Sequence, residues 1–326
     1  MPLAAPARAA DAAQRLRSAL AGRIVGMDDV VEQALWCVAS GSHGLLVGVP
    51  GLAKTLLVSS LAELLDLRFK RIQFTPDLMP SDIVGTEVLA PDGTGGRSFR
   101  FQPGPVFAQL LLADEINRTP PKTQAALMEA MEEGQVTSAG RRHALEPPFL
   151  VLATQNPIEQ EGTYPLPAAQ LDRFLVMVRV GYPGREDERR MVRRTTSRPR
   201  APLEPVLRRD EVLALQESVR GMRADDPVVR YTVATARATR PGPGAAEGIG
   251  DWVSFGAGPR AAGALLLAAK ARAALAGRHG PAREDVREVA RPVLRHRLVL
   301  SFRAAAEGIG ADAVVERALA AADAAP

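Results

Sequence analysis

The sequence has little cysteine and little lysine, and it lacks any long hydrophobic run. Cys37 is the single cysteine, so no disulfide can form within the chain, and no cysteine or histidine cluster has zinc-binding spacing. No apolar stretch approaches the ~20 residues that a membrane-spanning helix needs. Residues 1–13 contain two prolines, Arg8 and Asp11 in place of a hydrophobic signal core, so we expect a cytoplasmic protein.

What is present is typical of a globular protein. Of the 326 residues, 46% are hydrophobic and 24% are charged, which suits one large domain or two ordinary ones. The 41 basic residues exceed the 37 acidic ones by a net charge of +4, an excess too small to argue for nucleic-acid binding. Only four basic residues are lysines, so Lys54, inside a glycine-rich loop, stands out.

Strand-like and helix-like segments alternate in the first half of the chain. Short apolar runs at 44–47, 110–113, 149–153 and 174–180 are separated by helical patterns such as 55–65. Buried strands that alternate with helices predict a parallel sheet covered on both faces. We therefore expect an α/β fold with a three-layer αβα core.

Other segments depart from this alternation. Two of them predict β-hairpin insertions, near 86–101 and 134–148. An arginine- and proline-rich stretch then predicts an amphipathic helix followed by a linker, over 184–205. Beyond it, apolar residues recur with helical spacing and no segment has the pattern of a strand. The predicted organisation is a core over 1–183, the linker, and an all-helical unit over 206–326.

A glycine-rich loop follows the first predicted strand and opens a helix. In such a loop, backbone N–H groups can surround phosphate oxygens, Lys54 can reach the β- and γ-phosphates, and the Thr55 hydroxyl can bind Mg²⁺. Ala53 replaces the usual last glycine, which costs little if the backbone there is helical. Alone, the segment can also be a plain turn. The residues predicted to bind nucleotide here are Gly48, Pro50, Gly51, Leu52, Ala53, Lys54, Thr55 and Leu56.

Polar residues follow two later strands. Asp114 and Glu115 end an apolar run, a pattern that suits ATP hydrolysis because one carboxylate can hold Mg²⁺ and the other can polarise the attacking water. Asn156 could orient that water at the same edge of the sheet. Each feature alone can also be a polar turn at the end of a strand. The phosphate loop upstream makes a hydrolytic site the better interpretation of the acidic pair.

Hydrolysis of ATP also needs cations that stabilise the developing negative charge. Arg173 lies just before an apolar strand, and Arg260 lies in the first turn of a helix predicted in the second unit. The chain has 37 arginines. Spacing alone therefore does not distinguish these two from ordinary surface arginines.

From about residue 23 to residue 302, the sequence resembles the MoxR group of AAA+ ATPases. Nearly continuous stretches carry the resemblance, at 104–137, 153–157, 161–167 and 169–174. It implies a P-loop AAA+ core, a helical lid, and ATP and Mg²⁺ as cofactors. The glycine-rich loop would be Walker A, Asp114 and Glu115 would be Walker B, and Asn156 would be sensor 1.

The resemblance implies further roles. Arg173 would be an arginine finger acting on the nucleotide of the neighbouring subunit, and Arg260 would be sensor 2, which couples the lid to the γ-phosphate. Val25 and Gly26 resemble the segment that contacts adenine, although Met27 stands where the family usually has glutamine. The two hairpins resemble the helix-2 and pre-sensor-1 insertions, which point towards the axis or upper face of a ring.

The same resemblance implies a homo-oligomer, a hexameric ring, that remodels, activates or assembles a partner protein in a chaperone-like way. A von Willebrand factor A domain protein is a common partner in the family. Roles of this kind are implied by the family alone, because no element of the sequence identifies a particular substrate.

Two other functions stay open. A GTPase switch is disfavoured because guanine selectivity usually rests on an Asn-Lys-x-Asp element, and no lysine here follows an asparagine. A nucleic-acid-associated motor or regulatory ATPase would use the arginines of 185–200. Acidic residues at 186–188 favour a solvated helix with i,i+4 ion pairs instead. Nucleic acid is therefore not expected as a partner.

Overall fold

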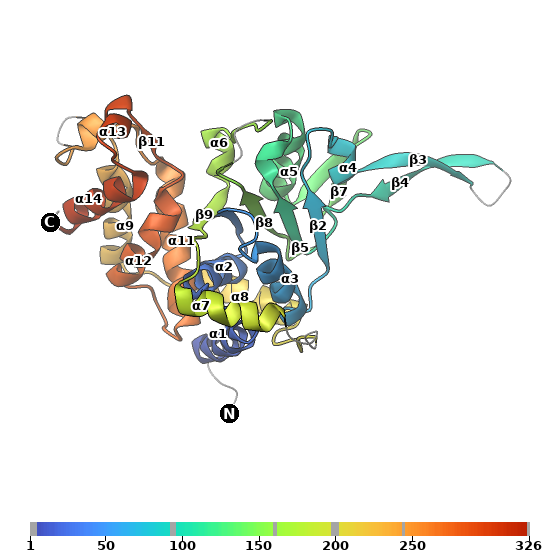
Figure 1. Ribbon diagram of the computed structural model, residues 1–326, viewed down its shortest axis with the longest axis horizontal. Helices are drawn as coiled ribbons and strands as arrows, with labels where there is room; N and C mark the ends of the chain where they lie inside the picture. The colour runs from blue at the N-terminus through green and yellow to red at the C-terminus, as the bar shows by residue number, and fades with distance from the viewer. Residues whose placement is uncertain (1–4, 92–95, 159–161, 197–201, 243–244, 325–326) are drawn as a thin grey trace.

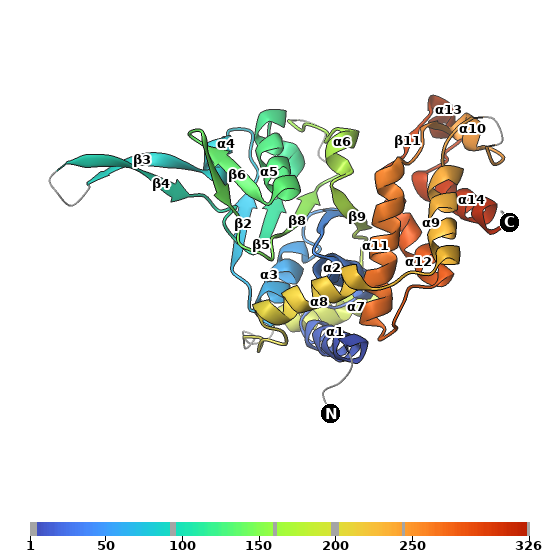
Figure 2. The same cartoon turned by 180° about the vertical axis from the view of Figure 1, so that it is seen from behind.

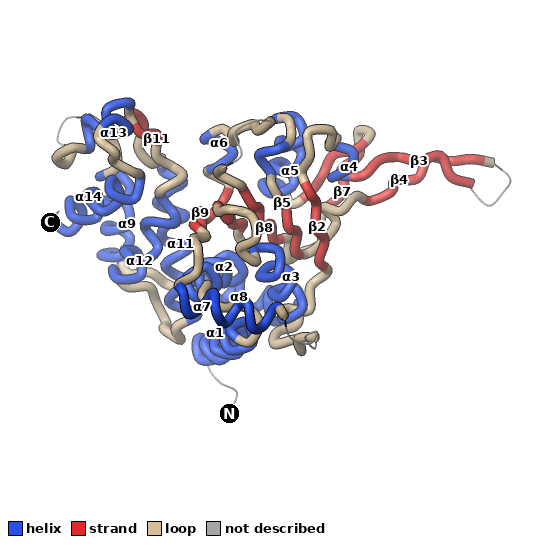
Figure 3. The backbone as a smooth tube through the Cα atoms, in the orientation of Figure 1, coloured by secondary structure: helices blue, strands red, loops and turns tan. Residues whose placement is uncertain are grey.

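The computed structural model describes residues 5–91, 96–158, 162–196, 202–242 and 245–324. It contains a half built around a β-sheet and a half built of helices, which lie side by side (Figure 1). The view from behind shows the same arrangement (Figure 2), and most strands belong to the first half (Figure 3). No helix within the described ranges is long and apolar enough to cross a membrane.

A five-stranded parallel sheet forms the centre of the first half. Its strands are β1 (His43–Val47), β2 (Phe69–Gln73), β5 (Leu110–Asp114), β8 (Leu150–Gln155) and β9 (Phe174–Arg179). The strand order is β2-β5-β8-β1-β9, so the first strand lies between two later ones. Four strands arise from the apolar runs in the sequence, because a strand covered on both faces needs apolar residues throughout. The fifth, β2, is an edge strand with three exposed residues and was not predicted.

Helices cover both sides of this sheet. One side carries α1 (Ala5–Ala21), α2 (Asp28–Ser40) and α3 (Lys54–Leu64); the other carries α4 (Pro80–Val84), η1 (Ile116–Arg118), α5 (Pro121–Glu133) and α6 (Ala168–Leu171). Side chains of β5 alternate between the two layers, as strand geometry requires. Leu110 and Leu112 pack into the cluster with α2 and α3, whereas Leu111 and Ala113 pack into the cluster with α5. The predicted three-layer αβα core is confirmed.

Two antiparallel hairpins project from this half. They pair β3 (Gly85–Pro91) with β4 (Arg97–Pro103), and β6 (Gln135–Ser138) with β7 (Arg141–Ala144). The first extends away from the body of the molecule (Figure 1), and the tip predicted for it includes residues 92–95, which lie outside the described residues. Phe101 of one hairpin stacks on His143 of the other, with ring centroids 3.8 Å apart. Both predicted hairpins are present, and this contact joins them.

The second half is helical, as predicted, with one addition. Two of its helices, α7 (Arg185–Thr195) and α8 (Arg209–Gly221), lie beside α1 and α2 of the first half (Figure 1). The others are α9 (Asp226–Ala238), α10 (Ile249–Trp252), α11 (Pro259–Leu275), α12 (Arg283–Leu294), α13 (Phe302–Ala306) and α14 (Ala311–Ala324). A short antiparallel ladder also joins β10 (Val253–Phe255) to β11 (Val299–Leu300). Strands of two and three residues are too short to show periodicity. Helix α7 occupies the first part of the predicted linker, and residues 197–201 are outside the described ranges.

The two halves share one hydrophobic core. Helix α11 packs against α1 and α2, and α8 packs against α2, so both halves contribute to the same buried cluster. Arg297, which follows α12 and is 4% exposed, pairs with Asp172 at 2.7 Å. It also donates to the backbone carbonyls of Phe174 at 2.7 Å and Leu175 at 3.1 Å. The helical half is therefore attached directly to the start of β9.

Candidate functional site

A cavity of about 440 Å³ lies at the carboxyl edge of the sheet. The strand order places the ends of β5, β8 and β1 next to one another there, which is where ligands bind in open α/β sheets. The cavity is lined by Pro50, Gly51, Leu52, Ala53, Lys54, Thr55, Leu56, Arg71, Gln73, Asp114, Glu115, Thr154 and Asn156. The fold therefore brings most of the predicted loop, the acidic pair and the predicted amide into one space.

The glycine-rich loop makes a tight turn between β1 and α3. A Cβ at Gly48 would collide with the carbonyl oxygen of Val180, so this position requires glycine. Gly51 has a φ of 84° and Ala53 a φ of 54°. Both values are left-handed, and for alanine this conformation costs about 1–2 kcal/mol. The helical backbone on which alanine would cost little is not what the structure shows.

The Lys54 side chain lies over this loop. Its Nζ donates hydrogen bonds to the carbonyl oxygen of Gly48 and, at 3.3 Å, to that of Val49. Partial burial lowers the pKa of Lys54, while the Asp114 and Glu115 carboxylates act in the opposite direction. The ammonium group thus interacts electrostatically with both predicted acidic residues.

Asp114 is fixed by side chains from the strands on either side of β5. Its Oδ1 accepts a hydrogen bond from Thr154 Oγ1 at 2.6 Å. Its Oδ2 accepts two, from Arg71 Nη2 at 2.6 Å and Arg71 Nε at 3.0 Å. Sequence reasoning missed Arg71 and Gln73. Their i,i+2 spacing on a strand, which places both on one face, was the available signal.

Glu115 lies next to Asp114 and has a left-handed backbone, with a φ of 57°. Its N–H donates to Thr154 Oγ1 at 2.8 Å. Its Oε2 accepts hydrogen bonds from Gln73 Nε2 at 2.8 Å and Arg118 Nη1 at 2.9 Å. A non-glycine residue in this conformation is held there by its surroundings, a feature that is concentrated at functional sites.

Asn156 follows β8 and is 3% exposed. Its Oδ1 accepts a hydrogen bond from the N–H of Ile158 at 3.2 Å. That bond is typical of a turn, and the same residue also lines the cavity. Asn156 therefore makes the hydrogen bond expected of a turn residue, and its role in orienting water stays a prediction.

Arg173 and Arg260 lie together, away from the cavity. Parallel pairing of β1 and β9 sets His43 opposite Phe174. Arg173 is thus at the amino edge of the sheet, about one strand length (~16 Å) from the loop that follows β1. Arg173 Nη2 lies 2.5 Å from Glu132 Oε2, and Arg260 Nη2 lies 3.4 Å from Glu132 Oε1. One carboxylate near the end of α5 therefore pairs with both predicted arginines.

Val25 and Gly26 belong to the connection between α1 and α2, and neither lines the cavity. The Val25 side chain is buried. Gly26 has a φ of 69°, and a Cβ there would lie 2.7 Å from a carboxylate oxygen of Asp187 on α7. The structure thus places the predicted adenine segment under α7 and does not join it to the other predicted residues.

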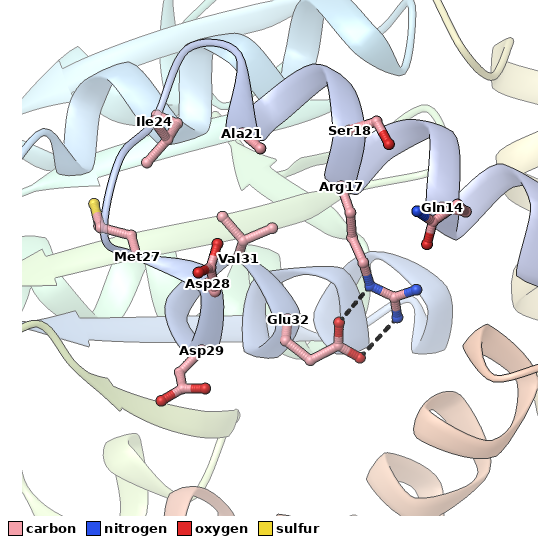
Figure 4. Close-up of a pocket in the computed structure, with 10 residues that line it drawn as sticks. All are labelled: Gln14, Arg17, Ser18, Ala21, Ile24, Met27, Asp28, Asp29, Val31 and Glu32. Carbon is pink, nitrogen blue, oxygen red and sulfur yellow. Dashed lines mark hydrogen bonds and ion pairs between the residues drawn. The ribbon is translucent and has the colours of Figure 1, made fainter. Parts of the chain in front are cut away.

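The residues that flank this segment border a separate hollow between α1 and α2. Ile24 and Met27 line it from the connection (Figure 4). Arg17 of α1 crosses it with two hydrogen bonds to Glu32 of α2, at 2.8 and 3.0 Å. None of the residues predicted to bind nucleotide lines this hollow.

The basic stretch that a nucleic-acid-binding protein would use forms α7. Arg189 pairs with Glu186 at 2.9 Å, and Arg190 pairs with Asp187. These pairs have i,i+3 spacing, whereas i,i+4 was predicted. The helix is nevertheless a charged face with internal partners, as the acidic residues in its sequence indicated.

Comparisons with known proteins cover both halves of the chain. Residues 43–176 match the family model described as "ATPase family associated with various cellular activities (AAA)", and residues 249–318 match an AAA lid domain. The chain is 46% identical over 297 residues to Chaperone MoxR1 of Mycobacterium tuberculosis, covering 91% of this chain and 78% of that protein. It is 31% identical over 307 residues to Protein MoxR of Methylorubrum extorquens, covering 89% of this chain and 88% of that protein.

A solved structure is similar over nearly the whole fold. It is the crystal structure of a protein from Cytophaga hutchinsonii, with a TM-score of 0.89 and 39% sequence identity, and the match covers 97% of this chain and 96% of that one. These matches agree with the resemblance carried by the sequence motifs. The chain belongs to the MoxR family of AAA+ ATPases and is an ATP-hydrolysing enzyme.

Proposed function

We propose that the chain hydrolyses ATP, with Mg²⁺, at the interfaces of a hexameric ring and uses the energy to remodel or assemble a partner protein. The observation that carries this proposal is the separation of Arg173 and Arg260 from the phosphate loop by the length of the sheet. Arginines at the opposite edge can complete a site only on another copy of the chain. A ring of identical interfaces provides that copy for every subunit.

The carboxyl edge supplies the nucleotide half of each site. The loop backbone and Lys54 bind the phosphates. Val25 and Gly26, which lie under α7 and outside the cavity, are left out of this assignment. Thr55 and Asp114 fit Mg²⁺, because a hydroxyl and a carboxylate oxygen on one cavity are ligands that this ion prefers. Among the described residues no three His, Cys, Asp or Glu side chains form a metal cluster, so phosphate and water would complete the coordination. When bound, Mg²⁺ neutralises charge on the phosphate oxygens.

Glu115 is the residue that activates water in this proposal. Its carboxylate is adjacent to Asp114 and is oriented by Gln73 and Arg118, and the role it takes is to accept a proton from the attacking water. Asn156, at the next strand end, orients that water. Glu115 lines the cavity from a residue with a left-handed backbone.

The amino edge supplies the second half, to the neighbouring subunit. Arg173 and Arg260 together carry two positive charges to the neighbour's γ-phosphate, where arginine can stabilise the charge that develops during transfer. Glu132 holds the two guanidinium groups side by side in the free subunit. The shared partner supports a common destination for both arginines.

We propose that the chain is organised into a nucleotide-binding core, a linker and a lid. We assign residues 1–183 to the nucleotide-binding core, 184–205 to a linker and 206–326 to the lid. The buried contact of Arg297 with Asp172 supports mechanical coupling, because it ties the lid to the residue next to Arg173. A movement of the lid would thus reach the arginine that acts on the neighbouring site.

A protein is the substrate that we propose for the remodelling step. The name of the relative Chaperone MoxR1 supports a chaperone-like role. The family commonly works with a von Willebrand factor A domain protein, which makes such a protein the partner to test. The long hairpin β3–β4 projects from the core and carries exposed Leu89 and Phe99 opposite each other, and these suit contact with a polypeptide.

Replacement of Glu115 by glutamine tests the hydrolytic assignment. Glu115→Gln keeps the shape of the side chain and removes the base, so ATP should still bind while hydrolysis falls by at least ~10²-fold. The trapped state should also favour the assembled ring, as measured by analytical ultracentrifugation with ATP. Glu217→Gln, an exposed change on α8, is the matched control. Normal turnover in Glu115→Gln would assign water activation to another residue.

A further inference from the structure

Arg71 places a positive charge on the carboxylate that would hold the metal. It lies on β2, whose register pairs Gln73 with Asp114, so Arg71 reaches Asp114 from the neighbouring strand. Both hydrogen bonds from its guanidinium end on the same oxygen, Oδ2, at 2.6 and 3.0 Å. Arg71 also lines the cavity beside the phosphate loop. A cation that belongs to the chain is therefore bound at the predicted metal ligand.

The hydrogen bonds around Asp114 use most of its capacity. A carboxylate oxygen has two lone-pair sites, and the two N–H donors of Arg71 fill those of Oδ2. The other oxygen, Oδ1, accepts from Thr154 at 2.6 Å. A divalent cation approaching Asp114 through Oδ2 must therefore displace the guanidinium, and one approaching through Oδ1 meets its positive charge nearby.

A purely structural ion pair is the other explanation for this contact. The Arg71 side chain is 47% exposed, and ion pairs that are this open to water contribute little to folding. Arg71 also makes a contact that a simple surface ion pair would not need. Its Nη2 donates a second hydrogen bond, to Gln73 Oε1, at 2.6 Å. Gln73 in turn donates to Glu115. Arg71 thus connects the two carboxylates of the site.

We propose that Arg71 is a built-in competitor of the divalent cation at Asp114. Without metal, its guanidinium neutralises Asp114 and lets the phosphates of a nucleotide enter beside the carboxylate. A metal that binds through Oδ2 must displace Arg71 from that oxygen, and one that binds through Oδ1 meets the charge of the guanidinium. Either way, Asp114 binds the metal less tightly than it would without Arg71. The inference rests on the proposed roles of the phosphate loop and Asp114, and it adds a residue that sets how strongly nucleotide binding depends on metal.

The test measures nucleotide affinity rather than hydrolysis. ADP binding to the full chain is measured by isothermal titration calorimetry, once with Mg²⁺ and once with EDTA, for the wild type and for Arg71→Gln. The quantity of interest is the ratio of the two dissociation constants, metal-free over metal-bound. Lys70→Gln is the matched control, because it removes one positive charge from the opposite face of β2. Thermal melting checks that each variant is folded.

Arg71→Gln should raise this ratio about tenfold or more, the effect of one charge pair worth ~1.4 kcal/mol. ADP should bind more weakly in EDTA, because Asp114 then repels the phosphates, and as tightly as before or tighter with Mg²⁺. Arg71→Lys, which keeps the charge but not the paired donors, should lie in between and serves if Arg71→Gln does not fold. Lys70→Gln should not change the ratio.

An unchanged or lower ratio in folded Arg71→Gln and Arg71→Lys would overturn the competitor role and leave a structural ion pair. The experiment distinguishes a failure of the proposed nucleotide site from a failure of the role proposed for Arg71. If wild-type protein binds no ADP under either condition, the nucleotide site itself is wrong. If the wild type binds ADP and only the ratio fails to respond to Arg71, the nucleotide site stands and the role of Arg71 does not.

Discussion

The two edges of the central sheet carry opposite kinds of chemistry. The carboxyl edge has the phosphate loop, two carboxylates and a buried amide around one cavity. The amino edge has Arg173 and Arg260, joined through Glu132. In the proposed mechanism, each edge supplies one part of the groups that hydrolyse ATP. Since β1 and β9 pair in parallel, the sheet itself keeps the two sets apart within one chain.

In the proposed ring, the same sheet would contribute one edge to each of two interfaces between subunits. Parallel strands end together at the carboxyl edge, which gathers short polar residues from several strands into one site. At the amino edge, the arginines have long side chains and are 27% and 70% exposed. Long, partly exposed cations suit contact with a neighbouring molecule better than with a cavity in their own chain.

The largest expected effect is the loss of nucleotide binding when Lys54, at the carboxyl edge, is replaced. Lys54→Ala removes the only cation of the phosphate loop, and the β- and γ-phosphates lose their charge-assisted hydrogen bonds. Nucleotide binding should be abolished in calorimetric titrations with Mg²⁺ and ATP. The exposed Lys122→Ala on α5 should bind like the wild type. Wild-type affinity in Lys54→Ala would remove the basis of the phosphate-loop assignment.

The next largest effect is expected at the amino edge, where replacement of Arg173 should change turnover and not the affinity for ATP. Arg173→Ala should lower turnover by ~10³-fold while leaving the affinity for ATP nearly unchanged, because the finger acts on the developing charge of another subunit's nucleotide. Steady-state hydrolysis and ATP titration of the same preparation provide the comparison. Arg230→Ala, on an 80% exposed side chain of α9, is the control. A loss of binding equal to that of Lys54→Ala would place Arg173 in its own chain's cavity.

A third prediction concerns the attachment of the lid to the amino edge. Arg297→Gln leaves Asp172 without its charged partner and removes donors to backbone carbonyls of β9. The free energy of unfolding should fall by ~3 kcal/mol, as for other broken buried pairs, measured by urea denaturation. Arg303→Gln, whose side chain is 60% exposed, should change it by less than ~0.5 kcal/mol. Equal effects of the two changes would refute a buried link.

The smallest expected effect is on stability, and it tests whether the backbone of the phosphate loop is strained at Ala53. Ala53→Gly relieves the left-handed backbone at this position and should raise the free energy of unfolding by ~1 kcal/mol. Ala214→Gly, at an exposed position within α8, should have the opposite sign and a similar size. Thermal or urea unfolding of the two variants checks the pair. A decrease in both would mean that Ala53 is not strained.

Most of the fold could be predicted from the sequence because apolar patterns reflect burial. The runs that became β1, β5, β8 and β9 are apolar throughout, since both of their faces are covered. The strand β2 was missed because it is an edge strand in which Lys70, Arg71 and Gln73 are exposed. Because these side chains are charged or polar, the strand has no apolar run by which it could be recognised.

The candidate site also contains some residues that could be predicted from the sequence and others that could not. The loop and the residues after β5 and β8 could be placed together because parallel strands end at one edge. Arg71 belongs to the strand that was missed, so its contact with Asp114 could not be foreseen. The pairing of Arg173 and Arg260 with Glu132 depends on how the helical half packs, and short-range sequence patterns do not contain that information. The left-handed backbone of Ala53 is likewise a feature of the folded loop.

The most direct test of a site shared between subunits is to mix two inactive variants. Lys54→Ala lacks the carboxyl-edge half and Arg173→Ala lacks the amino-edge half, so neither alone should hydrolyse ATP. In rings mixed at random in equal parts, about one interface in four joins an intact Lys54 to an intact Arg173 on the neighbour. Activity should then return to a fraction of the wild-type rate. Background activity in mixed rings, with mixing verified by native mass spectrometry, would contradict the shared site.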